Sequence, residues 1–317
     1  MLNLKSKSFE NLTIDATNAT YGIQFTSSCN NIVIRNCIIL SDETNSLTSV
    51  PIYKDNNTGI CNNIYIINNH IYGGFRGLYF YVGTSTSAFG TNIVIDSNIF
   101  ENQYEYGMYL YYGDSISLTN NKIYSRKKMP SEYWYAIWVQ CVNVNILSNC
   151  IIQRSADIIY PYGIYGNTIN IGNWNALIAN NIIDIQTPNA QAGIHLLNFR
   201  AEIFHNTIRV VGELGRGIYL GTGSLRRVKN NIIVTQGKSA YPIYLNNPFS
   251  INNDDIDANN LVGSSYVGYS SGARKTIIDW QKVITTDSHS VNIIPHFISK
   301  DNLILKDSIG LSVKSLK

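Results

Sequence analysis

Charged residues are scarce in this sequence. Asp, Glu, Lys and Arg together account for 14% of its 317 residues, and the formal net charge is only +3. Long runs of basic residues are absent, so a nucleic-acid partner is not indicated. No apolar stretch approaches the roughly 18 residues of a membrane-spanning helix, so we expect no membrane insertion. The first residues, MLNLKSKSFENLTI, lack the apolar core of a signal peptide.

Cysteine is also sparse, with five residues in all. No CxxC pair or Cys/His cluster has the spacing of zinc ligands, so no metal site is predicted from them. Cys29 and Cys61 each precede an Asn-Asn-Ile triplet and therefore occupy equivalent places in successive repeats. We interpret them as stacked small residues, with a disulfide between them as the alternative.

Helix-favouring residues are few as well. The chain has only 13 Ala, against 47 Ile, 40 Asn and 22 Tyr. β-branched and aromatic residues favour strands, and Asn favours turns. The composition therefore predicts an all-β protein with many turns.

A first repeated signature consists of a small residue or Pro, an apolar residue, any residue, and another apolar residue. Its copies are spaced by 24 to 30 residues. The first apolar residues of the copies are Ile23, Ile52, Leu78, Met108, Ile137, Ile164, Ile194, Ile218 and Ile243. Such alternation predicts one short, half-buried strand in each repeat.

A second signature follows each first one and centres on a polar pair, as in IINNHI, LTNNKI and IANNII. Asn tolerates the left-handed backbone that a sharp bend requires. Each repeat is thus predicted to run strand, loop, strand, Asn bend, strand, loop. Equivalent Asn side chains of successive repeats are placed to form a ladder.

A period of 24 to 30 residues is too short for the four-stranded blades of a propeller, which need roughly 40 residues. We therefore predict a parallel β-helix of about nine coils over residues 1–262, and a closing segment with a short capping helix over residues 263–317. Trp280 lies in that segment, and we expect it to cover the last coil. Residues 8–14 already read as the middle of a coil, so we expect further sequence or another chain to cover that end.

The repeat resembles a known family. The run GI-x-L followed by N-I-x-I-x-N-N-x-I is similar to the right-handed parallel β-helix repeat of the pectate-lyase-like superfamily, over roughly residues 9–262. The resemblance implies a right-handed solenoid in an extracellular or cell-surface protein. It does not define an activity, because the superfamily includes polysaccharide lyases, glycoside hydrolases, phage tailspikes and adhesins.

The residue between the two apolar positions of the first signature should point outward. That column is rich in aromatic residues, which Tyr81 and Tyr111 widen. It reads Gln24, Tyr53, Tyr79, Tyr109, Trp138, Tyr165, His195, Tyr219 and Tyr244. A row of rings suits the binding of sugars, and we predict substrate contacts at Tyr79, Tyr109, Trp138, Tyr165, Tyr219 and Tyr244. The alternative is that stacked rings only stabilise the sheet.

Acidic-polysaccharide cleavage by β-elimination needs a base, a cation for the substrate carboxylate and an acid for the leaving oxygen. We assign these roles to His195, to Arg200 and Arg226, and to Tyr219. The column holds no carboxylate pair, which makes a glycoside hydrolase the less favoured enzyme. No residue here matches the calcium-binding acidic cluster of pectate lyases.

The resulting hypothesis is an extracellular β-helix that binds, and in its active form cleaves, an acidic polysaccharide. The alternative is a non-catalytic structural or adhesive solenoid, such as a phage fibre or cell-surface protein. We predict no cofactor. The segment Asn252–Asp257 has oxygen ligands suited to Ca²⁺ but lacks a binding-loop template, so we interpret it as an exposed acidic loop.

Overall fold

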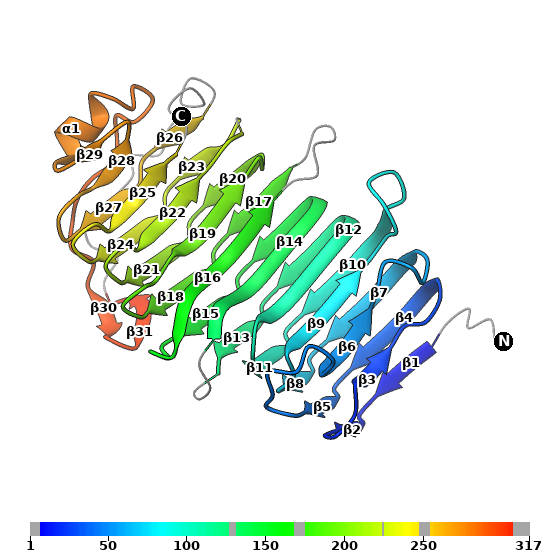
Figure 1. Ribbon diagram of the computed structural model, residues 1–317. Coiled ribbons are helices and arrows are strands. Elements are labelled where there is room, and N and C mark those ends of the chain that lie inside the picture. Colours follow the sequence, from blue (N-terminus) through cyan, green and yellow to red (C-terminus); the bar gives the residue numbers. More distant parts are fainter. Residues whose placement is uncertain (1–6, 127–130, 168–174, 224, 247–253, 307–317) are drawn as a thin grey trace.

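The computed structural model describes residues 7–126, 131–167, 175–223, 225–246 and 254–306. The described residues form a parallel β-solenoid of about nine turns that is nearly all β, which confirms the fold expected from the repeats. Strands of successive coils lie side by side along the whole length in Figure 1. In the described part of the chain, no helix has the length and apolar character needed to cross a membrane.

Each coil contributes strands to three faces. The first face consists of β3 (Tyr21–Gln24), β6 (Val50–Lys54), β9 (Arg76–Tyr81), β12 (Tyr106–Thr119), β14 (Ser131–Leu147), β16 (Ile158–Asn167), β19 (Ala192–Leu197), β22 (Arg216–Leu220), β25 (Tyr241–Leu245) and β28 (Gly268–Ser270). The second face consists of the later parts of β12 and β14 with β1 (Lys7–Glu10), β4 (Cys29–Arg35), β7 (Cys61–Ile67), β10 (Gly90–Asp96), β17 (Ala176–Ala179), β20 (Ala201–Phe204), β23 (Arg227–Lys229) and β26 (Asp255–Asp257).

The third face is a separate sheet, with ten strands among the described residues. They are β2 (Thr13–Ala16), β5 (Ile38–Ser41), β8 (His70–Tyr72), β11 (Ile99–Gln103), β13 (Lys122–Ser125), β15 (Cys150–Gln153), β18 (Ile182–Gln186), β21 (Thr207–Val211), β24 (Ile232–Gln236) and β27 (Asn260–Gly263). The first two faces belong to one continuous sheet, because β12 and β14 pass through both.

The first signature sets the register of the first face. All nine of its apolar positions, from Ile23 to Ile243, pair with one another in successive coils. Eight of the nine are completely buried, and only Ile23 near the first coil is partly exposed. Ile66, Ile95 and Ile178 of the second face are also buried. Stacked isoleucines therefore fill the interior.

The small residue of the signature allows the first and third faces to approach each other. A Cβ atom on Gly107 would lie 2.6 Å from the carbonyl oxygen of Ala136 and 2.8 Å from Cγ2 of Ile123. Such contacts are shorter than packed atoms allow, so a larger side chain would push the sheets apart.

The polar pair makes the bend between the second and third faces. Its first residue has a left-handed backbone, with φ of 52° at Asn68 and 54° at Asn120. Its second residue forms a buried ladder in which each backbone N–H and side-chain amide donates to the side-chain oxygen one coil later. The ladder runs through Asn69, Asn98, Asn121, Asn149, Asn181, Asn206, Asn231 and Asn259. The predicted Asn ladder is confirmed.

The C-terminal segment contains β29 (Ala273–Arg274), α1 (Ile277–Gln281), β30 (Phe297–Ser299) and β31 (Asn302–Leu305). Trp280 in α1 is fully buried, and its indole N–H donates to Asp287 at 2.7 Å. The β30–β31 hairpin then lies against the third face (Figure 1), where Arg209 donates to the carbonyl of Lys300 at 2.6 Å.

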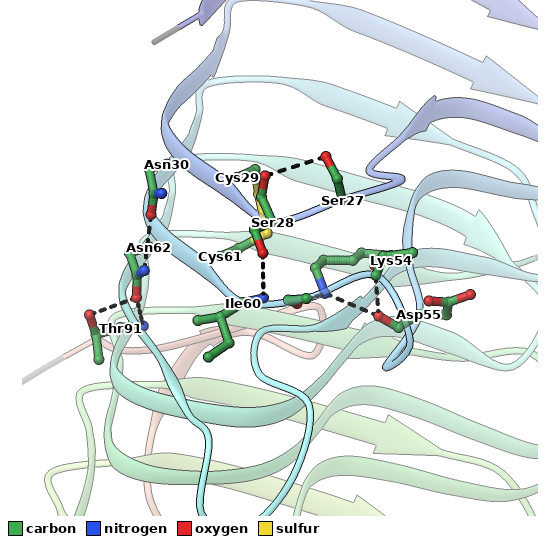
Figure 2. The surroundings of a disulfide bond; sticks show 12 residues. Ser27, Ser28, Cys29, Asn30, Lys54, Asp55, Ile60, Cys61, Asn62 and Thr91 are labelled. Carbon is green, nitrogen blue, oxygen red and sulfur yellow. Dashed lines mark hydrogen bonds between the residues drawn. A yellow bond between two sulfur atoms is a disulfide. The ribbon is translucent and has the colours of Figure 1, made fainter. Parts of the chain in front are cut away.

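A disulfide joins Cys29 to Cys61, which corrects the interpretation of these residues as stacked thiols. The two cysteines are paired in register on β4 and β7, with their Cα atoms 4.6 Å apart, within the range that a disulfide spans. Figure 2 shows the bridge between neighbouring coils, beside Lys54. The repeat pattern places the two residues together but does not distinguish thiols from a bridge.

Lys54 is the unusual neighbour of this disulfide. It pairs in register with Phe80 and is completely buried at a position that is apolar in most other coils. Its ammonium donates to the carbonyls of Asp55 at 3.1 Å and Gly59 at 2.5 Å (Figure 2). Burial lowers its pKa to about 8. Carbonyl dipoles thus replace the water that this charge loses.

Candidate functional site

The outward column of the first face forms a continuous line of rings, which we call the aromatic row. It consists of Tyr53, Tyr79, Tyr109, Trp138, Tyr165, His195, Tyr219, Tyr244 and Tyr269. Neighbouring ring centroids lie 4.1 to 6.1 Å apart, with interplanar angles of 6 to 21°. All six predicted substrate-contact residues belong to this row.

Two further lines of side chains flank the aromatic row. Tyr81 and Tyr111 lie on one side, with ring centroids 5.0 Å apart. The other side carries residues three positions earlier in each strand, directly before the small residue of the first signature, and these residues were not expected from the sequence. They are Arg76, Tyr106, Tyr135, Tyr162, Ala192, Arg216 and Tyr241. The small residue and the apolar residue after it both face inward, so the strict alternation is interrupted there, and the residue before the small one points outward again.

Stacking determines which parts of the rings reach solvent. Each ring of the row covers the faces of its neighbours in the adjacent coils, so the row presents mainly ring edges and phenol hydroxyls. The side chains are accordingly half-buried rather than exposed. Burial raises the pKa of Tyr53 and Tyr162 to about 12, so these phenols remain protonated hydrogen-bond donors at neutral pH.

Two arginines lie against the rings. The guanidinium of Arg76 lies 4.3 Å from the ring centroid of Tyr79 and 3.4 Å from the carboxylate of Glu105. Arg216 lies 4.7 Å from the ring centroid of Tyr244. Among the described residues, no carboxylate lies within ion-pair distance of Arg216, and its buried Nε has no hydrogen-bond partner. Arg216 is therefore an uncompensated cation on the aromatic surface.

His195 is held within the aromatic row. Its ring stacks between Tyr165 at 4.9 Å and Tyr219 at 4.1 Å, and Tyr162 meets it edge-on. Burial, together with the nearby Arg216 cation, lowers its pKa to about 3. The imidazole is neutral at physiological pH, but a group of such low basicity is a poor proton acceptor, because general bases work best with a pKa near the operating pH.

The two arginines proposed from sequence for a substrate carboxylate lie elsewhere. Arg226 is completely buried and paired with Asp254, with Nη2 and Oδ2 2.6 Å apart. Arg200 is exposed and, with Arg227 and Asn145, lines a groove of about 480 Å³ on the second face. Of the four residues assigned to catalysis, the structure thus brings together only His195 and Tyr219.

The described acidic residues of the segment Asn252–Asp257, which ends in β26, are engaged in ion pairs. Asn252 and Asn253 lie outside the described residues. Asp254 is buried against Arg226, which corrects the interpretation of this segment as an exposed loop. Asp257 pairs with His289 at 2.7 Å. In the part of the chain that the structure describes, no group of three or more His, Cys, Asp or Glu side chains is arranged to hold a metal ion.

The fold and this surface define a parallel β-solenoid with an extended aromatic face. Comparison with protein-family models, with curated proteins and with solved structures finds no match to this chain.

Proposed function

We propose that this protein binds an acidic polysaccharide along the aromatic row, as an extracellular or cell-surface β-helix of the pectate-lyase-like superfamily. The observation that carries the proposal is the unbroken line of nine rings with the uncompensated Arg216 beside it. A carboxylate is the natural partner of such a guanidinium, because the two groups form parallel, charge-assisted hydrogen bonds.

The proposed contacts follow from how the rings are arranged. Because neighbouring rings cover one another's faces, a sugar meets ring edges and phenol hydroxyls rather than open faces. The rings recur once per coil, at roughly 4.8 Å, which is the spacing between hydrogen-bonded strands, and all of them except Trp138 and His195 carry a hydroxyl. A polysaccharide lying along the solenoid axis would then meet phenol hydroxyls at most coils, and its carboxylate would meet Arg216.

The extracellular part of the proposal has its own support. The Cys29–Cys61 disulfide is of the kind that persists in oxidising surroundings and is rare in a reducing cytosol. The coil repeat, with its Ile stack and Asn bend, supports the proposed superfamily.

Cleavage by β-elimination has weaker support than binding. His195 has too low a pKa to be an effective base, and Arg226 is enclosed by Asp254. We therefore propose binding as the primary function. Cleavage is tested by incubating the protein with polygalacturonate and measuring the ultraviolet absorbance of the unsaturated product. Product formation that is lost in His195→Ala would restore the catalytic assignment.

A structural or adhesive solenoid is the second candidate. It is favoured by the mutual covering of ring faces, because stacked aromatic pairs contribute about 0.5–1.5 kcal/mol each to stability. Trp138 stacks on Tyr109 at 4.4 Å and on Tyr165 at 6.1 Å. On this reading, Trp138→Ala lowers the melting temperature, and no glycan binds the wild-type protein on a glycan array.

The deciding experiment is isothermal titration of the full chain with polygalacturonate, with dextran as the neutral polymer. We expect Arg216→Met to weaken polygalacturonate binding at least ~10-fold, which corresponds to about 1.4 kcal/mol. Arg35→Met is the matched control, since Arg35 is exposed on the second face and pairs with Glu10. Equal binding of dextran, or full binding by Arg216→Met, would contradict the proposal.

A further inference from the structure

A cavity of about 420 Å³ opens on the outer surface of the third face, away from the aromatic row. It lies over the ends of β11, β13 and β15. Tyr124 and Ile152, which point outward from neighbouring strands, contribute apolar surface to it. The polar groups that line it include Glu101, Arg126, Arg154 and Ser155. A cavity of this size accommodates a small molecule such as a monosaccharide.

Arg126 is the residue in this cavity that the rest of the fold leaves unexplained. It is only 3% exposed, and its guanidinium lies 3.7 Å from the ring centroid of Tyr104 in the preceding coil. Its Nε and Nη2 atoms are buried and have no hydrogen-bond partner. Buried polar groups are nearly always satisfied, so two unused donors on one buried cation call for a binding partner.

The other charged groups of the cavity already have partners. Arg154 pairs with Asp184 at 2.6 Å and with Asp301 at 2.7 Å. Nε2 of His70 lies 3.3 Å from the carboxylate of Glu101 and forms an ion pair with it when the imidazole is protonated. Among the described residues, no carboxylate lies within ion-pair distance of Arg126. Arg126 is therefore the cation of this cavity that has no ion-pair partner among the described residues.

We propose that this cavity binds a ring-bearing monocarboxylate, such as a free hexuronic acid or an aromatic acid, through Arg126. The planar guanidinium matches a carboxylate with two parallel hydrogen bonds. The ring of the ligand packs on Tyr124 and Ile152, and Ser155 offers a hydroxyl. Glu101 also lines the cavity and repels a doubly charged phosphate more strongly than a singly charged carboxylate. The site lies on a different face from the aromatic row and does not depend on the function proposed for it.

Isothermal titration of the full chain tests this site with D-glucuronate and benzoate. D-glucose and benzyl alcohol are the matched neutral probes, and inorganic phosphate is the dianionic probe. We expect binding of both carboxylates and none of the neutral probes. Arg126→Met should weaken carboxylate binding at least ~10-fold, whereas Arg35→Met, which removes an exposed arginine on another face, should leave it unchanged.

A second variant covers the case in which Arg126→Met does not fold, which circular dichroism would reveal. Ile152 is a half-buried, outward position, so Ile152→Glu should be tolerated and should place a carboxylate opposite Arg126. We expect it to abolish carboxylate binding. Unchanged affinity in a folded variant, equal binding of glucose or phosphate, or no heat from either carboxylate at millimolar concentration would overturn the proposal.

A competition experiment with polygalacturonate distinguishes a free acid from the end of a polysaccharide chain as the ligand of this site. If the site takes free acids, D-glucuronate binding persists in Arg216→Met, and polygalacturonate does not compete for it. If polygalacturonate competes through its chain ends, competition should increase with the number of ends when the polymer is shortened at constant mass. Loss of D-glucuronate binding in Arg216→Met would assign the acid to the aromatic row and overturn the site at Arg126.

Discussion

Arg226 and Asp254 form an ion pair inside the solenoid, with Nη2 and Oδ2 2.6 Å apart and both side chains at most 1% exposed. Nε of Arg226 also donates to this carboxylate at 3.1 Å, and Nη1 donates to the carbonyl of Gly221 at 3.1 Å. The pair connects the turn after β22 to the segment that leads into β26, 28 residues later. It is a structural link rather than a substrate contact.

Breaking this pair should be costly, because one charge would remain buried alone. We expect Arg226→Met to lower the free energy of unfolding by about 3–5 kcal/mol. The double variant Arg226→Met with Asp254→Leu should recover most of that loss, since apolar side chains of similar volume can replace a buried pair. Urea denaturation measures both. A double variant no more stable than the single one would contradict this account.

Substitution of an Asn in the middle of the ladder should also destabilise the protein. Asn149 accepts from the backbone N–H of Asn121 and donates to the carbonyl of Leu118 and to Asn181, all within 2.8 to 3.0 Å. Asn149→Ala leaves these buried groups without partners, so we expect a loss of about 2–4 kcal/mol, from roughly 1–3 kcal/mol for each unsatisfied group. Asn145→Ala, at an exposed position, is the control and should change stability by less than about 0.5 kcal/mol.

Docking of the β30–β31 hairpin should depend on pH. Burial raises the pKa of Asp184, but the hydrogen bonds from Arg209 and Arg154 outweigh this and hold the pKa below its ordinary value. Arg154 also pairs with Asp301 of the hairpin. A lowered pKa in the folded state means that the stabilisation is complete above the unfolded value of about 3.9, and is lost as pH falls through the folded value.

We therefore expect a hairpin that is protected at neutral pH and loosens below about pH 4. This loosening is measured by hydrogen exchange over residues 297–305 from pH 6 down to pH 3. The rates are corrected for the intrinsic pH dependence of exchange. Asp184→Asn should reduce protection at neutral pH and remove this acid transition. An unchanged transition in that variant would assign the pH dependence to other carboxylates.

The Cys29–Cys61 disulfide should stabilise the first coils. The bridge closes a segment with a sequence separation of 32 residues, and bridges of this kind typically contribute about 2–4 kcal/mol. Dithiothreitol should lower the melting temperature of the wild-type protein. The variant Cys29→Ala with Cys61→Ala should melt at the lower temperature with or without reductant. If reductant shifts both proteins equally, the effect comes from another cysteine.

Much of the backbone arrangement was predictable from the sequence. The nine apolar positions from Ile23 to Ile243 pair in the register that the repeat implies, including Ile52 and Ile164, whose copies match the signature least well. The aromatic row follows directly, because residues between two buried positions of a strand must point outward. The row even continues one coil further, to Tyr269.

Less of the candidate site was predictable. Sequence alone put Arg200 and Arg226 near His195, because all three follow closely in neighbouring repeats. The direction of a side chain after a turn depends on the turn's conformation and on partners far away in sequence, such as Asp254. The uncompensated Arg216 was missed because it lies just before the signature rather than within it.

The sequence by itself determined the coil, the register and the line of outward rings, because strand alternation and coil-to-coil stacking depend only on local pattern and nearest neighbours. The tertiary structure decided what these rings offer to a ligand and which charges are left to bind one. Ring faces are covered only once the coils stack. Arg226 is neutralised because a segment that follows no repeat brings Asp254 against it, whereas no carboxylate of the described residues lies within ion-pair distance of Arg126 or Arg216.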